Sequence, residues 1–592
     1  MIEARFDDLL PGRERSFRFI GPVGVIEARA PGEVGSALDA VEAAAARGLW
    51  AAGFVAYEAA PGIDPSLLVR TRTVDDPYAG LPLLWFAMFE GREEVPPFQP
   101  VGQPPPDRDG SPWRPSIDRT AFDGSVARIR EHIAAGDTYQ VNFTIRLRAR
   151  IEGDERDFYR DLCLGQRGGY GAYLSAKRYR VLSASPELFF RIEGERIVTR
   201  PMKGTAPRGR WTEEDDDAGA RLAASPKDRA ENAMIVDLLR SDLGRISKTG
   251  SVRVERLFEA ERYETVWQLT STIGSDLRPG TNLAGVFHAL FPSGSVTGAP
   301  KVATMRLIAG LEDSPRGVYC GAVGYLAPSG SGEPRANFNV AIRTVVFDAE
   351  THLAEYGVGG GITHDSSAAG EFDEVLAKAR VLSARRPSFD LFETLRHEGG
   401  GGFRHLGEHL ARLEGSARYF GFRFDPRAAD EALEKTVADL GGSDGRVRLS
   451  LSRDGSLSAE ASSVPPETDV PARLALHPDP VDPSDVWLFH KTTRRDAYER
   501  RRADRPDVDD VLLVNVRGEV TESTVANLAV RLSGEWVTPP LDCGLLPGTF
   551  RTVLLREGRL RERPVRADEL GAAEQLALVS SVRGWRRAVL VP

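Results

Sequence analysis

The sequence pattern changes character once along the chain, at the string ARRPSFD (residues 384–390). From about residue 117 up to this break, apolar residues recur in alternation at helix and strand spacings, and after it a new block with its own periodicity runs to the C-terminus. The second block is long enough to bury a core of its own. We therefore expect two parts, residues 1–385 and residues 386–592, with residues 1–115 as an N-terminal subregion of the first.

The overall composition excludes several classes of protein. The hydrophobic content of 41% and the charged content of 28% are those of a soluble globular chain, and a net charge of −9 argues against a broad basic surface for nucleic acid. No apolar run approaches the length of a membrane span, and the charged first residues lack the apolar core of a signal peptide. The three cysteines, Cys163, Cys320 and Cys543, share no disulfide or metal spacing. We expect a cytoplasmic protein without a disulfide framework.

The first part alternates predicted helices and strands along the chain. A Pro-rich segment, residues 93–117, is expected to be an exposed loop inside this part. Apolar residues at helical spacing predict helices over residues 34–48, 120–137, 227–247, 301–312 and 370–386. Runs that alternate in polarity or are rich in β-branched residues predict strands at residues 23–30, 49–60 and 138–151, and within 178–206 and 334–366.

Two of the predicted helices each carry a pair of carboxylates three residues apart. Asp228 and Glu231 share one helix face, and Glu371 and Glu374 share another. Because Mg²⁺ prefers a few carboxylates, retained waters and an anionic substrate, the two pairs together are suited to hold such an ion. Each pair by itself is more typical of a solvated helix face.

Five strings occur together in the first part. They are GDTYQVNFTIR (residues 136–146), PMKGT (201–205), FPSGSVTGAPKVATMRLI (291–308), IRT (342–344) and GVGGGITHDS (357–366). In this order they resemble the chorismate-utilising enzymes, a family that includes anthranilate synthase, aminodeoxychorismate synthase component I, isochorismate synthase and salicylate synthase. The resemblance covers residues 1–385 and implies an α+β fold, namely a two-subdomain β-sandwich flanked by helices.

Within this family, the lysine of PMKGT is the discriminating residue. Anthranilate synthases carry Ala where Lys203 stands, and Lys203 together with YQVN at residues 139–142 is similar to aminodeoxychorismate synthase component I. That resemblance implies that Lys203 attacks C2 of chorismate as the C4 hydroxyl leaves, and that ammonia then attacks C4 and expels the lysine to give 4-amino-4-deoxychorismate. It also implies that Glu187 is the general base and acid. A lysine nucleophile must be neutral, so burial or nearby cations must lower its pKa.

The same resemblance implies the ligands of the ion and of the substrate. Glu231 and Glu374 would ligate Mg²⁺, with Asp228 and Glu371 close behind, and the ion would hold the ring carboxylate of chorismate. The second carboxylate would lie against Arg343 and a run of glycines, because glycine lets the backbone approach an anion closely. The remaining expected substrate-binding residues are Gly359, Gly360 and Gly361 of that run, with Thr205, Thr297, Gly298 and Tyr325.

The source of ammonia is expected to lie outside the chain. Cys163 in DLCLGQRGG lacks the strand and glycines of a glutaminase nucleophile elbow, and no His-x-Glu string follows, so we interpret it as a cysteine in a helix core. The chain is expected to use a separate class I glutamine amidotransferase subunit, or free ammonia. The resemblance leaves open whether the N-terminal region also binds tryptophan.

The second part carries strings of another family. FETLR (392–396), HLGEHLARLEGSARYFGF (405–422) and residues 514–551, which end in LLPGTFR, resemble class IV aminotransferases. This pyridoxal-phosphate family includes branched-chain and D-amino-acid aminotransferases and aminodeoxychorismate lyase, and it implies an α/β domain that binds pyridoxal 5′-phosphate. Lys491 would carry the cofactor, and Glu522 would hold its protonated pyridine nitrogen. The remaining expected cofactor contacts are Arg412, Thr524, Asn527 and the backbone amides of Gly548 and Thr549.

Two other features of the second part bear on its interpretation. His405, Glu408 and His409 read as the inverted zincin string HxxEH, but no third ligand is evident, and the family's helix leading to Arg412 explains the same residues. The segment that precedes FET in the family is shorter here, so the small subdomain is trimmed at its start. A homodimer through this part is an arrangement that the family suggests.

Together the two parts predict two consecutive reactions. The first would make 4-amino-4-deoxychorismate, and the second would eliminate pyruvate from it to give 4-aminobenzoate, a folate precursor. Two alternatives stay open for the second part. One alternative to the lyase is an amino-acid aminotransferase, which activity with 2-oxoglutarate and an amino acid would reveal. The other is an inactive stabilising module, which would show no visible absorbance from a bound cofactor.

Overall fold

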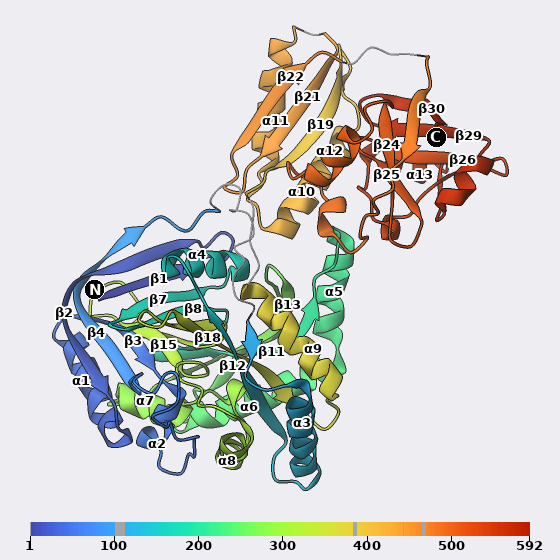
Figure 1. Ribbon diagram of the computed structural model, residues 1–592. Coiled ribbons are helices and arrows are strands. Elements are labelled where there is room, and N and C mark those ends of the chain that lie inside the picture. Colours follow the sequence, from blue (N-terminus) through green and yellow to red (C-terminus); the bar gives the residue numbers. More distant parts are fainter. Residues whose placement is uncertain (1, 101–112, 383–387, 442, 465–468) are drawn as a thin grey trace. The chain divides into compact units, whose positions relative to one another are not determined.

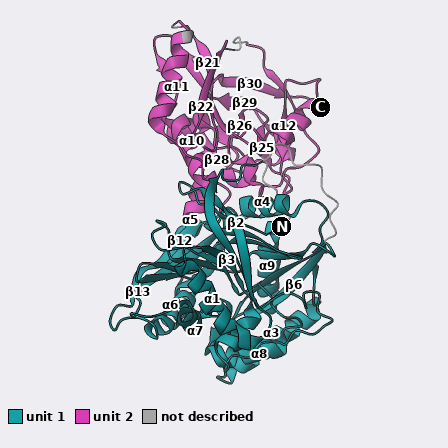
Figure 2. Ribbon diagram, turned by 90° about the vertical axis from the view of Figure 1, so that its left-hand side faces the viewer, with its two compact units in different colours: residues 1–208, 218–388 teal, residues 209–217, 389–592 magenta. Residues whose placement is uncertain are grey.

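The computed structural model describes residues 2–100, 113–382, 388–441, 443–464 and 469–592 (Figure 1). The chain forms two compact units (Figure 2): unit 1 comprises residues 1–208 and 218–388, and unit 2 comprises residues 209–217 and 389–592. The predicted boundary at 385/386 lies outside the described residues, as does the middle of the predicted Pro-rich loop. The assignment of residues 209–217 to unit 2 is a feature that the sequence pattern does not predict.

Unit 1 is built on one antiparallel sheet. The path of hydrogen-bonded neighbours runs β5, β6, β18, β17, β8, β7, β1, β2, β4, β3, β15, β16, β9, β10, β13, with β11 and β12 paired to β13 and β14 paired to β6. The strands are β1 (Glu3–Asp8), β2 (Arg15–Ala28), β3 (Trp50–Val55), β4 (Leu84–Val95), β5 (Arg114–Pro115), β6 (Gln140–Arg150), β7 (Tyr170–Ala176), β8 (Tyr179–Ser185), β9 (Leu188–Glu193), β10 (Arg196–Arg200), β11 (Met202–Pro207), β12 (Arg253–Arg262), β13 (Val266–Asp276), β14 (Gly298–Ala299), β15 (Ala322–Leu326), β16 (Ala336–Val340), β17 (Thr344–Asp348) and β18 (Leu353–Ile362).

This sheet curls over itself and encloses an aromatic core. Two strands lie between β2 and β15, so on a flat sheet these strands would be roughly 14 Å apart, at about 4.8 Å per strand. Instead, the ring centroid of Tyr325 on β15 lies 5.6 Å from that of Phe17 on β2 and 5.1 Å from that of Phe6 on β1. The facing layers form a β-sandwich, as predicted.

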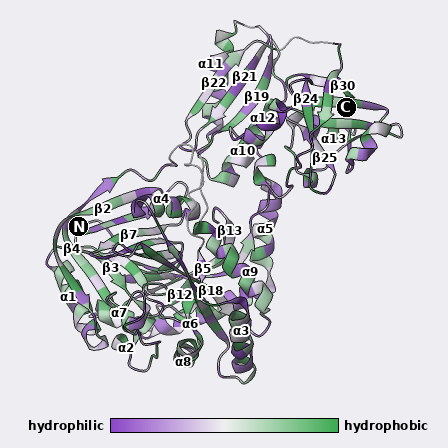
Figure 3. Cartoon of the chain, viewed as in Figure 1, coloured by the Kyte–Doolittle hydropathy of each residue, from purple (hydrophilic) through white to green (hydrophobic). Residues whose placement is uncertain are grey.

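Helices cover the outside of the sandwich as two groups. α1, α6 and α7 share a core cluster with β3 and β4, whereas α3, α4, α8 and α9 share one with β6 and β18. Each helix buries its apolar residues toward the strands, and the contrast between its faces can be followed in Figure 3. The helices up to residue 388 are α1 (Val34–Ala46), α2 (Ala60–Ile63), α3 (Arg119–Ala134), α4 (Glu155–Gln166), α5 (Thr212–Ala224), α6 (Pro226–Gly244), α7 (Leu283–Leu290), α8 (Lys301–Leu311) and α9 (Ala368–Ala379).

The five helices predicted for the first part are present as α1, α3, α6, α8 and α9. The strand predicted at residues 49–60 ends at Val55, because Pro61 sits at the start of α2 and begins a helical turn. Cys163 is buried on α4, which confirms its interpretation as a helix-core cysteine. In the part of the chain that the structure describes, no helix combines the length and the hydrophobicity needed to cross a membrane.

Unit 2 contains two sheets with helices, the predicted α/β arrangement. The smaller sheet has the order β20-β19-β21-β22 and packs on α10 and α11, and the larger has the order β25-β24-β23-β30-β29-β26-β27-β28. Its elements are β19 (Leu391–Glu398), β20 (Gly402–Phe403), α10 (Leu406–Phe420), α11 (Pro426–Asp439), β21 (Gly445–Leu451), β22 (Leu457–Ser462), β23 (Ala472–Leu476), α12 (Asp496–Ala503), β24 (Asp510–Val514), β25 (Val520–Ser523), β26 (Asn527–Leu532), β27 (Glu535–Thr538), α13 (Thr549–Arg556), β28 (Arg561–Glu562), β29 (Gln575–Ser580) and β30 (Gly584–Leu590).

Candidate active sites

A cavity of about 250 Å³ in unit 1 collects most of the residues that the sequence singles out. Strands β11 and β18 supply a lysine and the glycine run, and helices α6 and α9 supply the two carboxylate pairs. Of the expected catalytic, metal-ligating and substrate-binding residues, those that line this cavity are Glu187, Lys203, Thr205, Asp228, Glu231, Arg343, Gly359, Gly360, Gly361, Glu371 and Glu374.

Lys203 enters the cavity from β11 and is largely buried. Burial lowers the pKa of its amine, although Glu231, whose Oε2 lies 3.8 Å from Nζ, opposes that effect. Asn232, the next residue on α6, donates hydrogen bonds to the backbone oxygens of Lys203 and Leu269, both at 3.2 Å. A buried amide thus fixes the backbone beneath a lysine whose pKa is shifted in the direction that a nucleophile needs.

Gly361 allows the lysine to approach strand β18. A Cβ at this position would lie 2.2 Å from Nζ of Lys203 and 2.7 Å from Nε2 of Gln140, so a side chain here would displace both groups, and these two nitrogens lie within about 5 Å of each other. Both polar atoms of the Gln140 side chain are buried without a hydrogen-bond partner among the described residues. An unpaired buried amide beside the lysine is a group to which a ligand can bind.

The carboxylates on α9 are crowded. Burial and the like charge of Glu374 raise the pKa of Glu371, despite a hydrogen bond of 2.7 Å from Ser366. Burial also acts to raise the pKa of Glu374, but Lys378, whose Nζ lies 2.5 Å from Oε1, brings it below its usual value. Lys378 also donates a hydrogen bond of 2.8 Å to the backbone oxygen of Gly359. A cation therefore already neutralises part of this cluster.

The donor set of the cavity fits Mg²⁺ in its chemistry. All four candidate ligands are carboxylates. Burial is the main cause of the raised pKa of Glu371, and the like charge of Glu374, which a divalent cation would offset, adds to it. The side chains are not gathered around one point: among the described residues, no three His, Cys, Asp or Glu side chains are arranged to hold an ion. Coordination by Glu374 requires its release from Lys378.

Glu187 lies between β8 and β9 and is buried. Its Oε1 accepts a hydrogen bond of 2.6 Å from Oγ of Ser295, a residue in the string FPSGSVTGAP. Burial raises its pKa to about 7, against the opposing effects of Ser295 and Lys203. A carboxyl group that titrates near neutral pH is suited to both giving and taking a proton.

Three of the expected substrate-binding residues do not line this cavity. Tyr325 points from β15 into the sandwich core and lines a separate cavity of about 510 Å³, because its place on the strand sets the face on which its ring lies. Thr297 is buried and donates its hydroxyl to the backbone oxygen of Ser293. Gly298 pairs with Val141 in the sheet. The neighbouring Ser295 and Val296 line the cavity instead.

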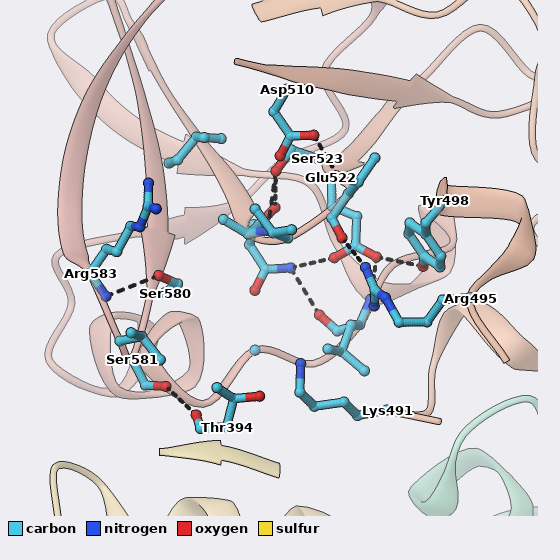
Figure 4. Close-up of a pocket in the computed structure, with 18 of the residues that line it drawn as sticks. Thr394, Lys491, Arg495, Tyr498, Asp510, Glu522, Ser523, Ser580, Ser581 and Arg583 are labelled. Atoms are coloured by element: carbon cyan, nitrogen blue, oxygen red, sulfur yellow. Dashed lines mark hydrogen bonds between the residues drawn. The ribbon is translucent and has the colours of Figure 1, made fainter. Parts of the chain in front are cut away.

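Unit 2 contains a second cavity, of about 450 Å³, around Lys491 (Figure 4). The lysine lies between β23 and α12 in the sequence, where its backbone oxygen accepts a hydrogen bond of 3.1 Å from the backbone nitrogen of Phe392 on β19. Burial, with the nearby charge of Arg412, lowers the pKa of the lysine to about 7. All the expected cofactor contacts line this cavity: Arg412, Lys491, Glu522, Thr524, Asn527, Gly548 and Thr549.

Glu522 is held at the inner end of this cavity by three donors, two of which are side chains (Figure 4). Its Oε1 accepts hydrogen bonds from the Tyr498 hydroxyl at 2.9 Å and the Leu546 backbone nitrogen at 3.1 Å, and Oε2 accepts one from Asn527 at 3.1 Å. Burial raises the pKa of Glu522 to about 7. A fixed, buried carboxylate that forms no ion pair with a described residue fits the protonated pyridine nitrogen of pyridoxal phosphate.

A buried carboxylate orients Arg412, and the sequence patterns do not identify this carboxylate as a functional group. Glu393 of the FETLR string accepts hydrogen bonds from Nε and Nη2 of Arg412 at 2.8 and 2.6 Å, and it also pairs with Nδ1 of His409 at 2.7 Å. Arg412 brings the pKa of Glu393 to about 2, although burial acts to raise it. Arg412 also donates to the Pro547 backbone oxygen, next to the start of α13, which fits a phosphate held by this arginine and the α13 amides.

The HxxEH residues turn to different partners. His409 is committed to Glu393 and to the Ser581 hydroxyl, whereas Glu408 pairs with Arg556.

Thr524 donates to Asp510, so its side chain supports the wall of the cavity. Asn527 explains why residue 548 is glycine, because a Cβ there would lie 1.8 Å from its Oδ1.

Comparison with known proteins agrees with this division. Residues 11–384 match the model of the chorismate binding enzyme family, and residues 390–591 match that of class IV aminotransferases. Because the first match spans more than half of the chain, the protein belongs to the chorismate binding enzyme family. The solved structure of anthranilate synthase component I from Streptococcus pneumoniae TIGR4 is 27% identical and superimposes with a TM-score of 0.53, over 62% of this chain and 92% of that one.

Two kinds of curated relative match unit 1 equally well. Anthranilate synthase component 1 from Aquifex aeolicus is 40% identical over 270 residues, which are 46% of this chain and 53% of the relative. Aminodeoxychorismate synthase component 1 from Klebsiella aerogenes is also 40% identical, over 273 residues, which are 46% of this chain and 59% of the relative. The chain thus spans little more than half the length of these relatives, and overall similarity does not separate the two activities.

Proposed function

We propose that the chain makes 4-aminobenzoate from chorismate in two steps, amination at C4 in unit 1 and elimination of pyruvate in unit 2. The observation that carries the proposal is Lys203, a largely buried amine with a lowered pKa in a cavity formed by the family's strings. Anthranilate synthases resemble this chain elsewhere but carry Ala at that position, so an amine there supports a covalent route to C4.

In the first step, Nζ of Lys203 bonds to C2 of chorismate, the ring double bonds shift, and the C4 hydroxyl leaves as water with a proton from Glu187. The alkylated lysine then returns a proton to the Glu187 carboxylate. Ammonia bonds to C4, the double bonds shift back, and the bond from C2 to Nζ breaks as Glu187 reprotonates the lysine nitrogen. The ammonium formed at C4 then returns its extra proton to the Glu187 carboxylate. The net change replaces a hydroxyl by an amine and releases water. The pKa of Glu187, about 7, suits this double role.

Substrate binding in unit 1 is proposed to use both kinds of charge. Glu231 and Glu374 would hold Mg²⁺, with Asp228 and Glu371 behind them, and the ion would supply positive charge for the ring carboxylate of chorismate. The other carboxylate would lie against Arg343 and the amides of the glycine run. Arg343 is already oriented, since its Nη1 donates a hydrogen bond of 2.5 Å to the backbone oxygen of Lys378.

Ammonia is proposed to come from a separate glutamine amidotransferase. The relatives of unit 1 are named as component 1 of their enzymes, which supports a second component. Cys163, on which a glutaminase in this unit would depend, is buried on α4, where burial raises the pKa of its thiol well above the usual value. Such a thiol is a poor nucleophile.

In the second step, pyridoxal phosphate bound in unit 2 would serve as the electron sink for removal of the C4 proton of 4-amino-4-deoxychorismate. Lys491, with a pKa of about 7, takes that proton. The bond from C3 to the enolpyruvyl oxygen then breaks and the ring becomes aromatic, while the released enolate takes up the proton held by Lys491 and leaves as pyruvate. Glu522 would hold the pyridine nitrogen, and Arg412 with the α13 amides would hold the phosphate.

The test is to incubate the purified chain with chorismate, Mg²⁺, ammonium and pyridoxal phosphate, and to identify the products by chromatography and mass spectrometry. The proposal expects 4-aminobenzoate and pyruvate in equal amounts. Anthranilate as the product would overturn the assignment of unit 1. Accumulation of 4-amino-4-deoxychorismate alone, with amino transfer to 2-oxoglutarate, would replace the lyase by an aminotransferase.

A further inference from the structure

The solvent-exposed part of the Lys491 cavity is lined by arginines that the proposed reaction has not used. We call them the arginine rim: Arg446, Arg448, Arg502, Arg583 and Arg586. They come from three separate stretches of the chain, namely β21, α12, and the turn and strand that follow β29. Because these stretches lie far apart in sequence, only the fold brings the five side chains together.

The local structure explains why these side chains face the cavity. Along β21, Val447 and Leu449 are buried in the core of the small sheet, so the alternation of the strand places Arg446 and Arg448 on its exposed face. Arg583 occupies the turn after Ser580 and Ser581, and in Figure 4 it lies on the opposite side of the cavity from Arg495 and Tyr498.

The rim carries more positive charge than its surroundings neutralise. The Arg583 guanidinium has no hydrogen bond or ion pair with any described residue, and burial together with Arg586, Arg502 and Arg446 lowers its pKa, with only Asp509 opposing. Arg586 lies 3.7 Å from Asp509, and its buried Nε has no hydrogen-bond partner among the described residues.

Arg502 adds a further weakly paired cation, since its Nη1 is 4.0 Å from Asp510. Arg448 stacks over the Phe392 ring, with 4.1 Å from Cζ to the ring centroid. That stacking holds the guanidinium in place while leaving its N–H groups available to an anion. Guanidinium groups bind carboxylates through two parallel hydrogen bonds, so this cluster suits a carboxylate rather than an uncharged group.

We propose that the arginine rim binds the second carboxylate of a substrate that carries two, and so selects dicarboxylates over monocarboxylic amino acids. The inference rests on the proposed cofactor site of unit 2. An amino acid with one carboxylate would leave most of the rim unpaired, whereas 4-amino-4-deoxychorismate carries both a ring and an enolpyruvyl carboxylate. A dicarboxylic amino acid such as glutamate also carries two carboxylates, so the experiment must distinguish glutamate from 4-amino-4-deoxychorismate as the substrate.

The test compares three single variants of the full chain with pyridoxal phosphate bound. Arg583→Gln and Arg586→Gln each remove one charge of the rim. Arg587→Gln is the matched control. Arg587 is an exposed arginine of β30 that follows Arg586 directly, so it lies on the other face of that strand. The measured quantities are KM and kcat for pyruvate release from 4-amino-4-deoxychorismate, at low and at high salt.

We expect KM to rise roughly tenfold to a hundredfold in Arg583→Gln and Arg586→Gln, the range for a lost hydrogen bond to a charged group. The kcat should change little, because the rim binds the substrate and transition state alike. Added salt should raise the wild-type KM more than that of either variant. Arg587→Gln should behave as wild type. Visible absorbance of the bound cofactor shows whether each variant still binds it. If Arg586→Gln loses that absorbance, the comparison rests on Arg583→Gln, because Arg583 is exposed.

The outcomes separate this inference from the proposed function. Pyruvate release with an unchanged KM in both variants would overturn the rim and leave the lyase standing. Amino transfer from glutamate in place of pyruvate release, with KM for glutamate raised in the same variants, would uphold the rim and overturn the lyase. A preference for a monocarboxylic amino acid such as alanine, with no effect of either variant, would overturn both.

Discussion

Glu187→Gln is expected to make unit 1 more stable at alkaline pH while removing most of its activity. The pKa of Glu187 is about 7 in the folded chain, against an ordinary value of 4.5, and burial is the main cause. Between these values the folded state binds more protons than the unfolded state, so the stability contributed by this carboxyl is complete below pH 4.5 and is lost as pH rises through 7. Glutamine has the same shape and no charge, and it therefore avoids that loss.

The size of the effect follows from the two pKa values. The advantage of the glutamine variant should grow from about 1 kcal/mol at pH 5.5 to about 3 kcal/mol at pH 8. For a unit of about 380 residues this corresponds to a rise in melting temperature of about 2 °C and about 4 °C, respectively. The assay is thermal unfolding at both pH values, following the transition that added chorismate shifts, since a ligand stabilises only the unit that binds it.

Glu193→Gln is the matched control, because Glu193 is an exposed carboxylate on the strand that follows Glu187. Its melting temperature should stay within about 1 °C of wild type, as expected for a surface substitution. In Glu187→Gln the rate of chorismate amination should fall by about 10²- to 10⁴-fold, the usual contribution of a general acid or base. Parallel melting curves of wild type and Glu187→Gln across this pH range would refute the argument that burial raises the pKa of this carboxyl.

Four further substitutions test separate parts of the two sites. Glu231→Gln and Glu374→Gln should each weaken the apparent affinity for Mg²⁺, measured from the Mg²⁺ dependence of chorismate consumption; an unchanged dependence in both would show that α6 and α9 share no ion. Glu393→Gln should weaken binding of pyridoxal phosphate, read from visible absorbance on titration, because it removes the carboxylate that orients Arg412 and breaks a buried pair whose loss costs about 3–5 kcal/mol. Lys491→Ala should abolish that absorbance and let 4-amino-4-deoxychorismate accumulate without 4-aminobenzoate; continued 4-aminobenzoate formation at the wild-type rate would contradict the role of this lysine.

Much of the first site could be predicted because its residues occur in short, specific strings. Lys203, Glu231 and Glu374 each belong to a local pattern on one element, and the cavity brings these elements together. Tyr325 lies outside the Lys203 cavity because the face of a strand on which a side chain lies depends on register, which the resemblance does not fix. Asn232 follows Glu231 directly in the sequence. Its hydrogen bond to the backbone of Lys203 could not be predicted, because that bond depends on the contact between α6 and β11.

In unit 2 the expected cofactor contacts could be predicted as residues of one cavity for the same reason, whereas Glu393, which orients Arg412, and the arginine rim could not. Glu393 stands in the quoted FETLR string, yet its function depends on α10 packing against β19, which brings Arg412 and His409 to it. Arg446 and Arg583 are single exposed arginines in a chain rich in arginine, with no local pattern to mark them. Their proposed role depends on their proximity to one another in the folded chain, which the spacing of residues along the sequence does not reveal.

The central claim, that Lys203 forms a covalent bond to chorismate, is tested most directly by mass spectrometry of the intact chain incubated with chorismate and Mg²⁺ in the absence of ammonia. The account predicts that the protein gains the mass of chorismate less one water, that digestion places the gain on the peptide containing Lys203, and that ammonium removes it as 4-amino-4-deoxychorismate appears. The Lys203→Ala variant should show neither the mass gain nor the product. Amination at the wild-type rate in that variant, without any mass gain in the wild type, would contradict the account.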